Sequence, residues 1–322
     1  MNSGVGKSHR IPISTRERIV CLLASLTLGF TAWSFGGYGN FSLHLLFLGS
    51  LATFLVSVVP MPSAWNGVSR EHGNLKNFKR ILAQPFFWTS SFFLGYILIQ
   101  CFNPSLVQVF SEKSWWVESM THPLGKNLPS SVKADYSIMN AFRVLVIQVS
   151  AISLALGILV GIQRKKTALI VLWSFVTSGV AMSFVAILQK LSGTKKILWV
   201  VDVANANPWG TFAYRNQSAA FLLLVLLISG VLYFFYERKS SRKLETSGPH
   251  LLILLFIFIL SGSIWLSLSR SGVILGSLLF GLFLILAFFN VFLRGINFKF
   301  WITLVTFFTL LFLGSIFIFK LS

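Results

Sequence analysis

Long apolar stretches, separated by short polar segments, run along almost the whole chain. A helix that crosses the hydrocarbon core of a membrane needs about 20 mostly apolar residues. The stretches that approach or reach this length span residues 19–36, 41–60, 84–102, 142–162, 167–189, 217–236, 250–268, 272–293 and 300–319. The pattern predicts an all-α fold, that of a polytopic membrane protein with about nine transmembrane helices. We expect these helices to form a single transmembrane helical domain over residues 1–322.

Composition agrees with a membrane protein. The 322 residues are 55% hydrophobic and only 11% charged, with a mean hydropathy of +0.78, whereas a soluble domain carries about a quarter charged residues. The net charge of +19 would by itself suggest a nucleic-acid partner. Cytoplasmic loops of membrane proteins collect Lys and Arg, however. We therefore expect membrane lipid, and no nucleic acid, among the partners.

The positions of the basic residues predict the orientation. With the N-terminus in the cytoplasm, every inner segment is short and basic, and these segments hold most of the 27 Lys and Arg residues. Because basic loops stay cytoplasmic, the sequence predicts a multi-pass protein with a cytoplasmic N-terminus.

The predicted outer side has two longer loops, residues 103–141 and 190–216. Both contain Trp, which often lies at the level of the lipid headgroups. For the first loop two interpretations stay open: an amphipathic interfacial helix near 111–119, or an anchored loop.

Cysteine and glycine inside the stretches predict packing and no chemistry. Cys21 and Cys101 each lie within an apolar stretch, which favours small buried side chains over a disulfide or a metal pair. Two Gly-x-x-x-Gly segments, Gly157–Gly161 and Gly272–Gly276, let neighbouring helices approach closely.

Two arginines stand at the edges of apolar stretches on the predicted outer side. Arg215 opens the sixth stretch, and Arg270 separates the seventh from the eighth, although Ser269-Arg270 also fits the middle of one long helix. Charges at membrane depth are costly and usually functional. A guanidinium group binds phosphate through paired, charge-assisted hydrogen bonds. Asn216 and Ser269 are the polar neighbours of these two arginines.

Each arginine has a simpler interpretation, in which its side chain only reaches the lipid headgroups. One isolated arginine would favour that interpretation. Two, each within a polar run between apolar stretches, favour a binding site for an anionic group. A helix that begins near Arg215 also points its backbone N–H groups toward the outer interface, which suits an anion.

Two segments, Gly210-Thr-Phe-Ala-Tyr-Arg-Asn-Gln-Ser-Ala-Ala-Phe221 and Ser267-Leu-Ser-Arg-Ser-Gly272, together resemble the O-antigen ligase family of bacterial inner-membrane proteins. In that family a Gly-x-Phe-x-x-(Arg)-Asn-x-x-Ala-type segment enters a helix, and a Ser-Arg-(Ser/Gly) segment follows at the outer end of a later hairpin. The resemblance covers roughly residues 195–290, whereas the first six stretches match only as hydrophobic helices.

The resemblance implies a glycosyltransferase of lipopolysaccharide biosynthesis at the periplasmic face of the inner membrane. The donor would be a glycan on undecaprenyl pyrophosphate, and the acceptor a hydroxyl of lipid A–core or of another glycan. Arg215 and Arg270 would bind the pyrophosphate leaving group, with Asn216 and Ser269 as orienting partners, and fixed positive charge would stabilise it without a metal or a cofactor. Ligase and polymerase both fit.

The chain departs from the family at the general base. The family uses a histidine in a large periplasmic loop after a late span, and this chain ends at Ser322, where that loop would begin. His44 and His122 lie toward the outer side but do not match the family's position, so the catalytic residue is unknown. The chain is interpreted as the N-terminal part of such a transferase, or as a member that binds donor lipid without transfer.

Two other function classes stay open: a membrane transporter, and a non-catalytic accessory protein that binds lipid-linked glycans. Transporters typically show repeats, broken helices and ionisable residues near the bilayer centre. None of the eight acidic residues lies deep in a predicted stretch, and the polar clusters lie at the outer edge, which favours the transferase. The missing histidine loop keeps the accessory protein open.

Overall fold

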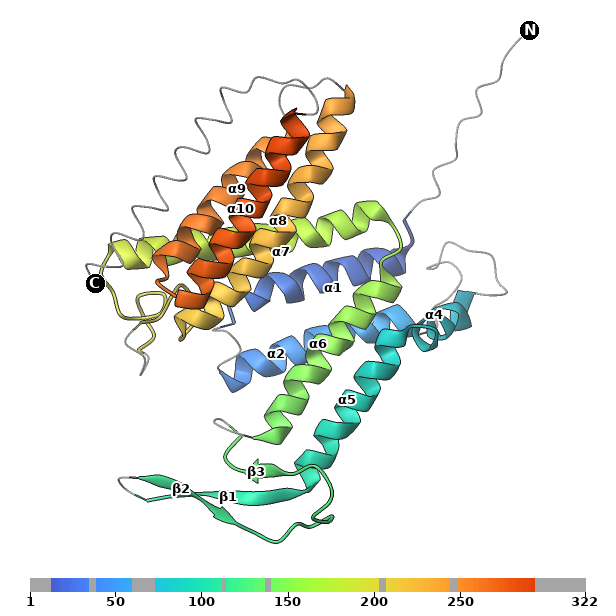
Figure 1. Ribbon diagram of the computed structural model, residues 1–322. Coiled ribbons are helices and arrows are strands. Elements are labelled where there is room, and N and C mark those ends of the chain that lie inside the picture. Colours follow the sequence, from blue (N-terminus) through green and yellow to red (C-terminus); the bar gives the residue numbers. More distant parts are fainter. Residues whose placement is uncertain are drawn as a thin grey trace. The chain divides into compact units, whose positions relative to one another are not determined.

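Nearly all of the regular structure is helical. The computed structural model describes residues 13–34, 39–59, 73–111, 114–136, 140–202, 207–243 and 248–292 (Figure 1). The helices in these residues are α1 (Thr15–Thr31), α2 (Asn40–Val58), α4 (Gly73–Leu82), α5 (Pro85–Phe102), α6 (Ala141–Gly161), α7 (Lys165–Leu191), α8 (Arg215–Lys243), α9 (Pro249–Leu266) and α10 (Arg270–Phe292). Seven of the described helices, α2 and α5 to α10, are long and apolar enough to cross a membrane. The predicted all-α polytopic fold is confirmed, and the protein is a multi-pass membrane protein that contacts lipid.

The two ends of the predicted series differ from the other stretches. The first stretch, 19–36, corresponds to α1, which begins at Thr15 and has 17 residues, and α1 is not among the seven described helices that are long and apolar enough to cross a membrane. The ninth stretch, 300–319, lies outside the described residues. The break at Ser269-Arg270 is real, because α9 ends at Leu266 and α10 begins at Arg270.

The chain divides into two compact units. Unit 1 comprises Met1–Thr27 and Gly39–Val171, and unit 2 comprises Leu28–Tyr38 and Leu172–Ser322. Helices α1 and α7 therefore contribute residues to both units. The single transmembrane domain over residues 1–322 stays a prediction.

Unit 1 is built on close packing of α6 against α2. A Cβ atom at Gly157 would lie only 3.0 Å from the backbone nitrogen of Phe54, and one at Gly161 would lie 3.0 Å from the Cβ of Ser57. Only glycine allows such an approach, so the packing role predicted for this glycine pair is confirmed. The short helix α4 is joined to the end of α2 by Asn77 Nδ2, which donates to the carbonyl oxygen of Ser57 at 2.9 Å.

The predicted outer loop 103–141 contains a small sheet in place of a helix. Strand β1 (Pro104–Phe110) pairs antiparallel with β2 (Trp115–Ser119) and parallel with β3 (Ser131–Lys133), in the order β2-β1-β3 (Figure 1). The interpretation of the segment near 111–119 as an interfacial helix is therefore wrong. The segment is rich in Val and aromatic residues, which favour strands, and pairing such as Phe110 with Trp115 satisfies its backbone.

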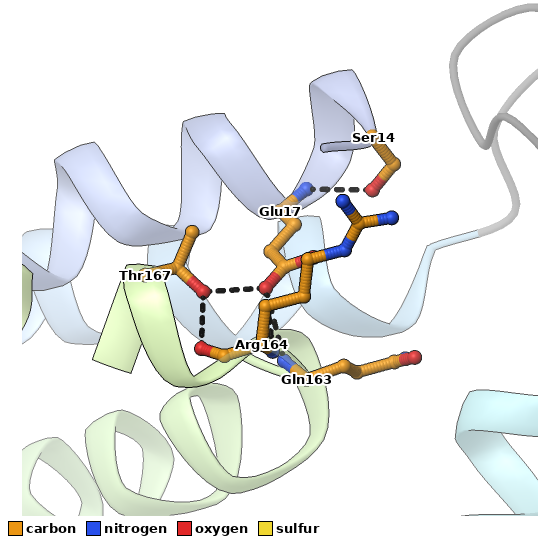
Figure 2. Close-up of polar contacts among 5 residues, drawn as sticks. All are labelled: Ser14, Glu17, Gln163, Arg164 and Thr167. Carbon is orange, nitrogen blue, oxygen red and sulfur yellow. Dashed lines mark hydrogen bonds and ion pairs between the residues drawn. The ribbon is translucent and has the colours of Figure 1, made fainter. Parts of the chain in front are cut away.

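A buried carboxylate joins α1 to the connection between α6 and α7. Figure 2 shows Glu17 pointing at this connection: its Oε1 accepts from the backbone N–H of Arg164 at 2.8 Å, from that of Gln163 at 3.2 Å and from the Thr167 hydroxyl. Glu17 Oε2 lies 3.7 Å from Arg164 Nε. The residue is 5% exposed. Glu17 thus caps the N-terminus of α7, where free N–H groups need acceptors.

Unit 2 packs α8 against α9 and α10 (Figure 1). Its apolar core includes the rings of Tyr233, Phe280 and Phe283, with the Tyr233 and Phe283 centroids 5.1 Å apart. The Thr211 hydroxyl donates to the carbonyl oxygen of Ala32. This bond places the loop before α8 against the residues that follow α1.

Candidate functional site

Helices α8 and α10 begin side by side, and each begins with one of the predicted arginines. Arg215 is the first residue of α8, and Arg270 is the first residue of α10. A Cβ atom at Gly272 would lie 2.5 Å from the Cβ of Ala219. The missing side chain at Gly272 therefore lets the first turn of α10 approach the start of α8, which brings the two sequence motifs together.

A hydrogen bond joins the two motifs directly. The Ser269 hydroxyl donates to Asn216 Oδ1 at 2.8 Å, and Ser269 Oγ accepts from the backbone N–H of Gly272 at 3.3 Å. Ser269 is thus the N-cap of α10 and is fully buried, whereas Asn216 is exposed. A serine hydroxyl has one donor, and Ser269 gives it to Asn216. The donor that this pair offers to a ligand is therefore Asn216 Nδ2.

The turn between α9 and α10 is tightly constrained. The Ser267 hydroxyl donates to the carbonyl oxygen of Ile264 at 2.7 Å, and Leu268 has a positive φ of 53°. A left-handed backbone is unfavourable for a branched residue. Leu268 adopts it so that the chain reverses within the three residues that separate the two helices.

The two guanidinium groups have no competing partner in the part of the chain that the structure describes. Arg215 is partly buried and Arg270 is exposed. Neither forms a hydrogen bond or an ion pair with a described residue. Both groups are therefore free to bind an anion.

Arg215 also lines a cavity of about 190 Å³ in unit 2. Three further basic residues, Lys190, Lys195 and Lys196, line it together with Gln189, Trp209 and the end of α9. Arg270, Asn216 and Ser269 are not among its lining residues. The sequence predicts that these lysines lie in an outer loop, and no role was predicted for them. Their clustering directly after an apolar stretch is the signal that could have marked them.

The described parts of the loop before α8 line this cavity and are held in place by several contacts. Ile197 and Val201 pair by backbone hydrogen bonds, and Ile197 is 1% exposed. Trp209 is 4% exposed, and its ring N–H donates to Ser263 Oγ of α9 at 3.2 Å. Gly210 has a φ of 62°, and a Cβ atom there would lie 2.6 Å from Met182 Sδ. The described parts of the loop are therefore fixed against α7 and α9.

The outer-side histidines belong to unit 1. His44 Nδ1 lies 2.7 Å from the carbonyl oxygen of Asn40, and its ring stacks on Tyr136. His122 lies in the loop between β2 and β3, and its Nδ1 is buried without a hydrogen-bond partner among the described residues. Neither lines the cavity at Arg215, so the general base stays unassigned. The described residues contain no cluster of metal-ligating side chains.

Comparisons with protein-family models, with curated proteins and with solved structures found no match. The resemblance to the O-antigen ligase family therefore rests on the two motifs, and the family stays a prediction.

Proposed function

We propose that this protein is an O-antigen ligase-like glycosyltransferase of the bacterial inner membrane. It would move a glycan from undecaprenyl pyrophosphate to an acceptor hydroxyl, such as one of lipid A–core, at the periplasmic face. The observation that supports this most is the hydrogen bond between Ser269 and Asn216. It joins two motifs that are about fifty residues apart in the sequence and sets Arg215 and Arg270 at adjacent helix starts.

The chemistry of the reaction suits such a site. The acceptor oxygen attacks the anomeric carbon of the donor, the bond from that carbon to the pyrophosphate oxygen breaks, and the hydroxyl proton passes to a base. Negative charge grows on the pyrophosphate as the bond breaks. Fixed guanidinium groups and the N-terminal ends of two helices stabilise negative charge where it develops.

The contacts support a role for each residue in this proposal. Arg215 and Arg270 bind oxygens of the pyrophosphate, and Asn216 Nδ2 donates a further hydrogen bond. Ser269 holds Asn216 through its Oδ1 and is a positioning residue. The apolar lipid chain of the donor would lie along exposed side chains of the same helices, among them Leu227 and Val231 of α8 and Leu278 of α10.

The test replaces each arginine and follows donor binding and transfer separately. We expect Arg215→Ala and Arg270→Ala each to weaken binding of undecaprenyl pyrophosphate at least about tenfold, because a hydrogen bond to a charged group contributes about 1.5–3 kcal/mol. Transfer to a lipid A–core acceptor should fall in parallel, and membrane insertion should be unchanged. Lysine at either position should restore little, because it lacks the planar fork.

Arg238→Ala is the matched control. Arg238 is an exposed arginine near the other end of α8, so its loss changes the net charge equally without touching the proposed site. Normal glycan attachment in both the Arg215 and Arg270 variants would refute the assignment.

The same assay separates the alternatives. An accessory protein would bind the donor without transfer. This alternative stays open, because no histidine lines the described cavity as a base. A transporter would move the lipid-linked glycan across the bilayer. Each described spanning helix is continuous, which does not favour the broken helices typical of transporters.

A further inference from the structure

The cavity at the end of α7 carries more positive charge than the nearby helix ends balance. Its base lies at the C-terminal ends of α7 and α9, and each helix C-terminus carries about half a negative charge, which favours cations. Four basic side chains, Lys190, Lys195, Lys196 and Arg215, line the cavity, which is more positive charge than two helix ends offset. Among the described residues only Lys196 has an acidic partner, Asp202, with Nζ and Oδ2 3.0 Å apart. The charge that remains on the lysines and Arg215 suits a bound anion.

A second feature of the cavity indicates a ligand with hydroxyl groups. Gln189 lines the cavity and is 6% exposed. Its Nε2 donates to the carbonyl oxygen of Lys196 at 3.3 Å, whereas its Oε1 is buried without a hydrogen-bond partner among the described residues. A buried acceptor without a donor costs about 1–3 kcal/mol. An ionised phosphate oxygen cannot meet this need, because it brings no donor, but a hydroxyl group can.

We propose that this cavity binds a sugar phosphate, with the phosphate on Lys190, Lys195 and Arg215 and a sugar hydroxyl donating to Gln189 Oε1. The volume of about 190 Å³ is well above the roughly 30 Å³ that one water molecule occupies in the liquid. Trp209 supplies a rigid apolar wall, held by its bond to Ser263. The inference rests on the proposed function, because it makes this ligand the first sugar of the lipid-linked donor and the phosphate attached to it.

The cavity assignment is distinct from the arginine pair. Arg215 takes part in both, whereas Arg270, Asn216 and Ser269 do not line the cavity. Lys190, Lys195 and Gln189 are therefore specificity residues for the sugar-phosphate end of the donor. Their replacement should weaken binding of a sugar phosphate that carries no lipid.

The experiment measures binding of three soluble probes to the purified full chain by calorimetry at fixed ionic strength. The probes are hexose 1-phosphate, inorganic phosphate and the free hexose. We expect Lys190→Ala combined with Lys195→Ala to weaken binding of hexose 1-phosphate and of inorganic phosphate about tenfold or more. Gln189→Leu should weaken binding of the hexose 1-phosphate about five- to tenfold, because its sugar hydroxyl loses the amide oxygen that accepts from it, and should affect inorganic phosphate less, because the lysines hold that group.

Lys126→Ala combined with Lys133→Ala is the matched control, because both lysines are exposed in the other predicted outer loop. It removes the same net charge and should leave binding of every probe unchanged. Both cavity lysines are exposed, so their variants should fold even if Gln189→Leu does not.

The outcomes separate this inference from the proposed function. If the wild-type chain binds no hexose 1-phosphate, or if the cavity variants bind it as the wild type does, the cavity assignment is wrong, whatever Arg270→Ala does to transfer. If the cavity variants lose hexose 1-phosphate while the wild-type chain neither binds undecaprenyl pyrophosphate nor transfers glycan, the cavity assignment holds and the proposed function is wrong.

Discussion

At the scale of single residues, Glu17 shows how a role can depend on partners far away in the sequence. Its carboxylate accepts from backbone N–H groups at Gln163 and Arg164, the latter 147 residues along the chain. From the sequence it was one acid among basic residues on the predicted inner side. No local pattern marks a residue that caps a helix distant in sequence, so this contact became visible only in the fold.

Replacement of Glu17 should destabilise the protein strongly. Glu17→Ala leaves two backbone N–H groups without their acceptor and leaves the Thr167 hydroxyl only the carbonyl oxygen of Arg164, and each buried unsatisfied group costs about 1–3 kcal/mol. We expect a loss of at least about 2 kcal/mol in the free energy of unfolding, with a smaller loss for Glu17→Gln, which keeps an acceptor oxygen.

Thermal unfolding in detergent, followed by tryptophan fluorescence, measures this. Asp202→Ala is the control, because its ion pair with Lys196 is exposed and such pairs contribute about 0–1 kcal/mol. Equal melting temperatures for Glu17→Ala and the wild type would show that the carboxylate does not cap α7.

The candidate site was only partly predictable from the sequence. Reasoning along the chain finds the polar neighbours of each arginine, and the contact between Asn216 and Ser269 bears out that the two motifs lie together. The sequence did not identify Gln189 or Lys190 as site residues. They lie at the end of α7, which a loop of more than twenty residues separates from Arg215. Their binding roles stay predictions.

At the scale of elements, hydrophobicity predicted the long helices and failed where other forces decide. Each predicted stretch from 41–60 to 272–293 overlaps one of the spanning helices described, because a membrane leaves few alternatives to a helix. The sheet in residues 104–133 was missed because short strands depend on pairing partners as well as on propensity. The apolar pattern also did not predict that α1 ends at Thr31, because the apolar stretch continues to residue 36.

The packing of α10 on α8 gives a matched pair of glycine variants. In Gly272→Ala the new Cβ would lie 2.5 Å from Ala219 Cβ, and neither atom can move without its helix, so the helix starts must separate. We expect a loss of about 1–3 kcal/mol in the free energy of unfolding, as for other overpacked sites. Pyrophosphate binding should weaken as well, because Ser269 and Asn216 separate with the helices.

Gly281→Ala is the control on the same helix, since a Cβ atom there meets nothing within 4 Å. It should be neutral or stabilising by up to about 1 kcal/mol, because alanine favours a helix over glycine. Thermal unfolding and pyrophosphate calorimetry on both variants give the comparison. If Gly272→Ala matched Gly281→Ala in both, the two helix starts would not be in close contact.

At the scale of the whole molecule, the proposed function depends on which side of the membrane holds the starts of α8 and α10. The spanning helices establish a multi-pass protein, but its orientation rests on the charge distribution alone. Arg238 and Lys239 lie near one end of α8, and Arg215 lies at the other. Because cytoplasmic loops are enriched in Lys and Arg, the end of α8 that carries Arg238 and Lys239 is predicted to face the cytoplasm. Arg215, at the other end, is then predicted to face the periplasm.

Cysteine labelling across α8 tests this orientation on a single helix. Tyr214→Cys and Lys239→Cys place exposed thiols just before Arg215 and near the opposite end of α8. The native Cys21 and Cys101 are buried, so background reaction should be low. In cells whose outer membrane is permeabilised, a membrane-impermeant maleimide should label residue 214 and not residue 239, and lysis should expose 239. The reverse pattern would place Arg215 in the cytoplasm, where no periplasmic acceptor could reach the donor, and would overturn both the predicted orientation and transfer at the outer face.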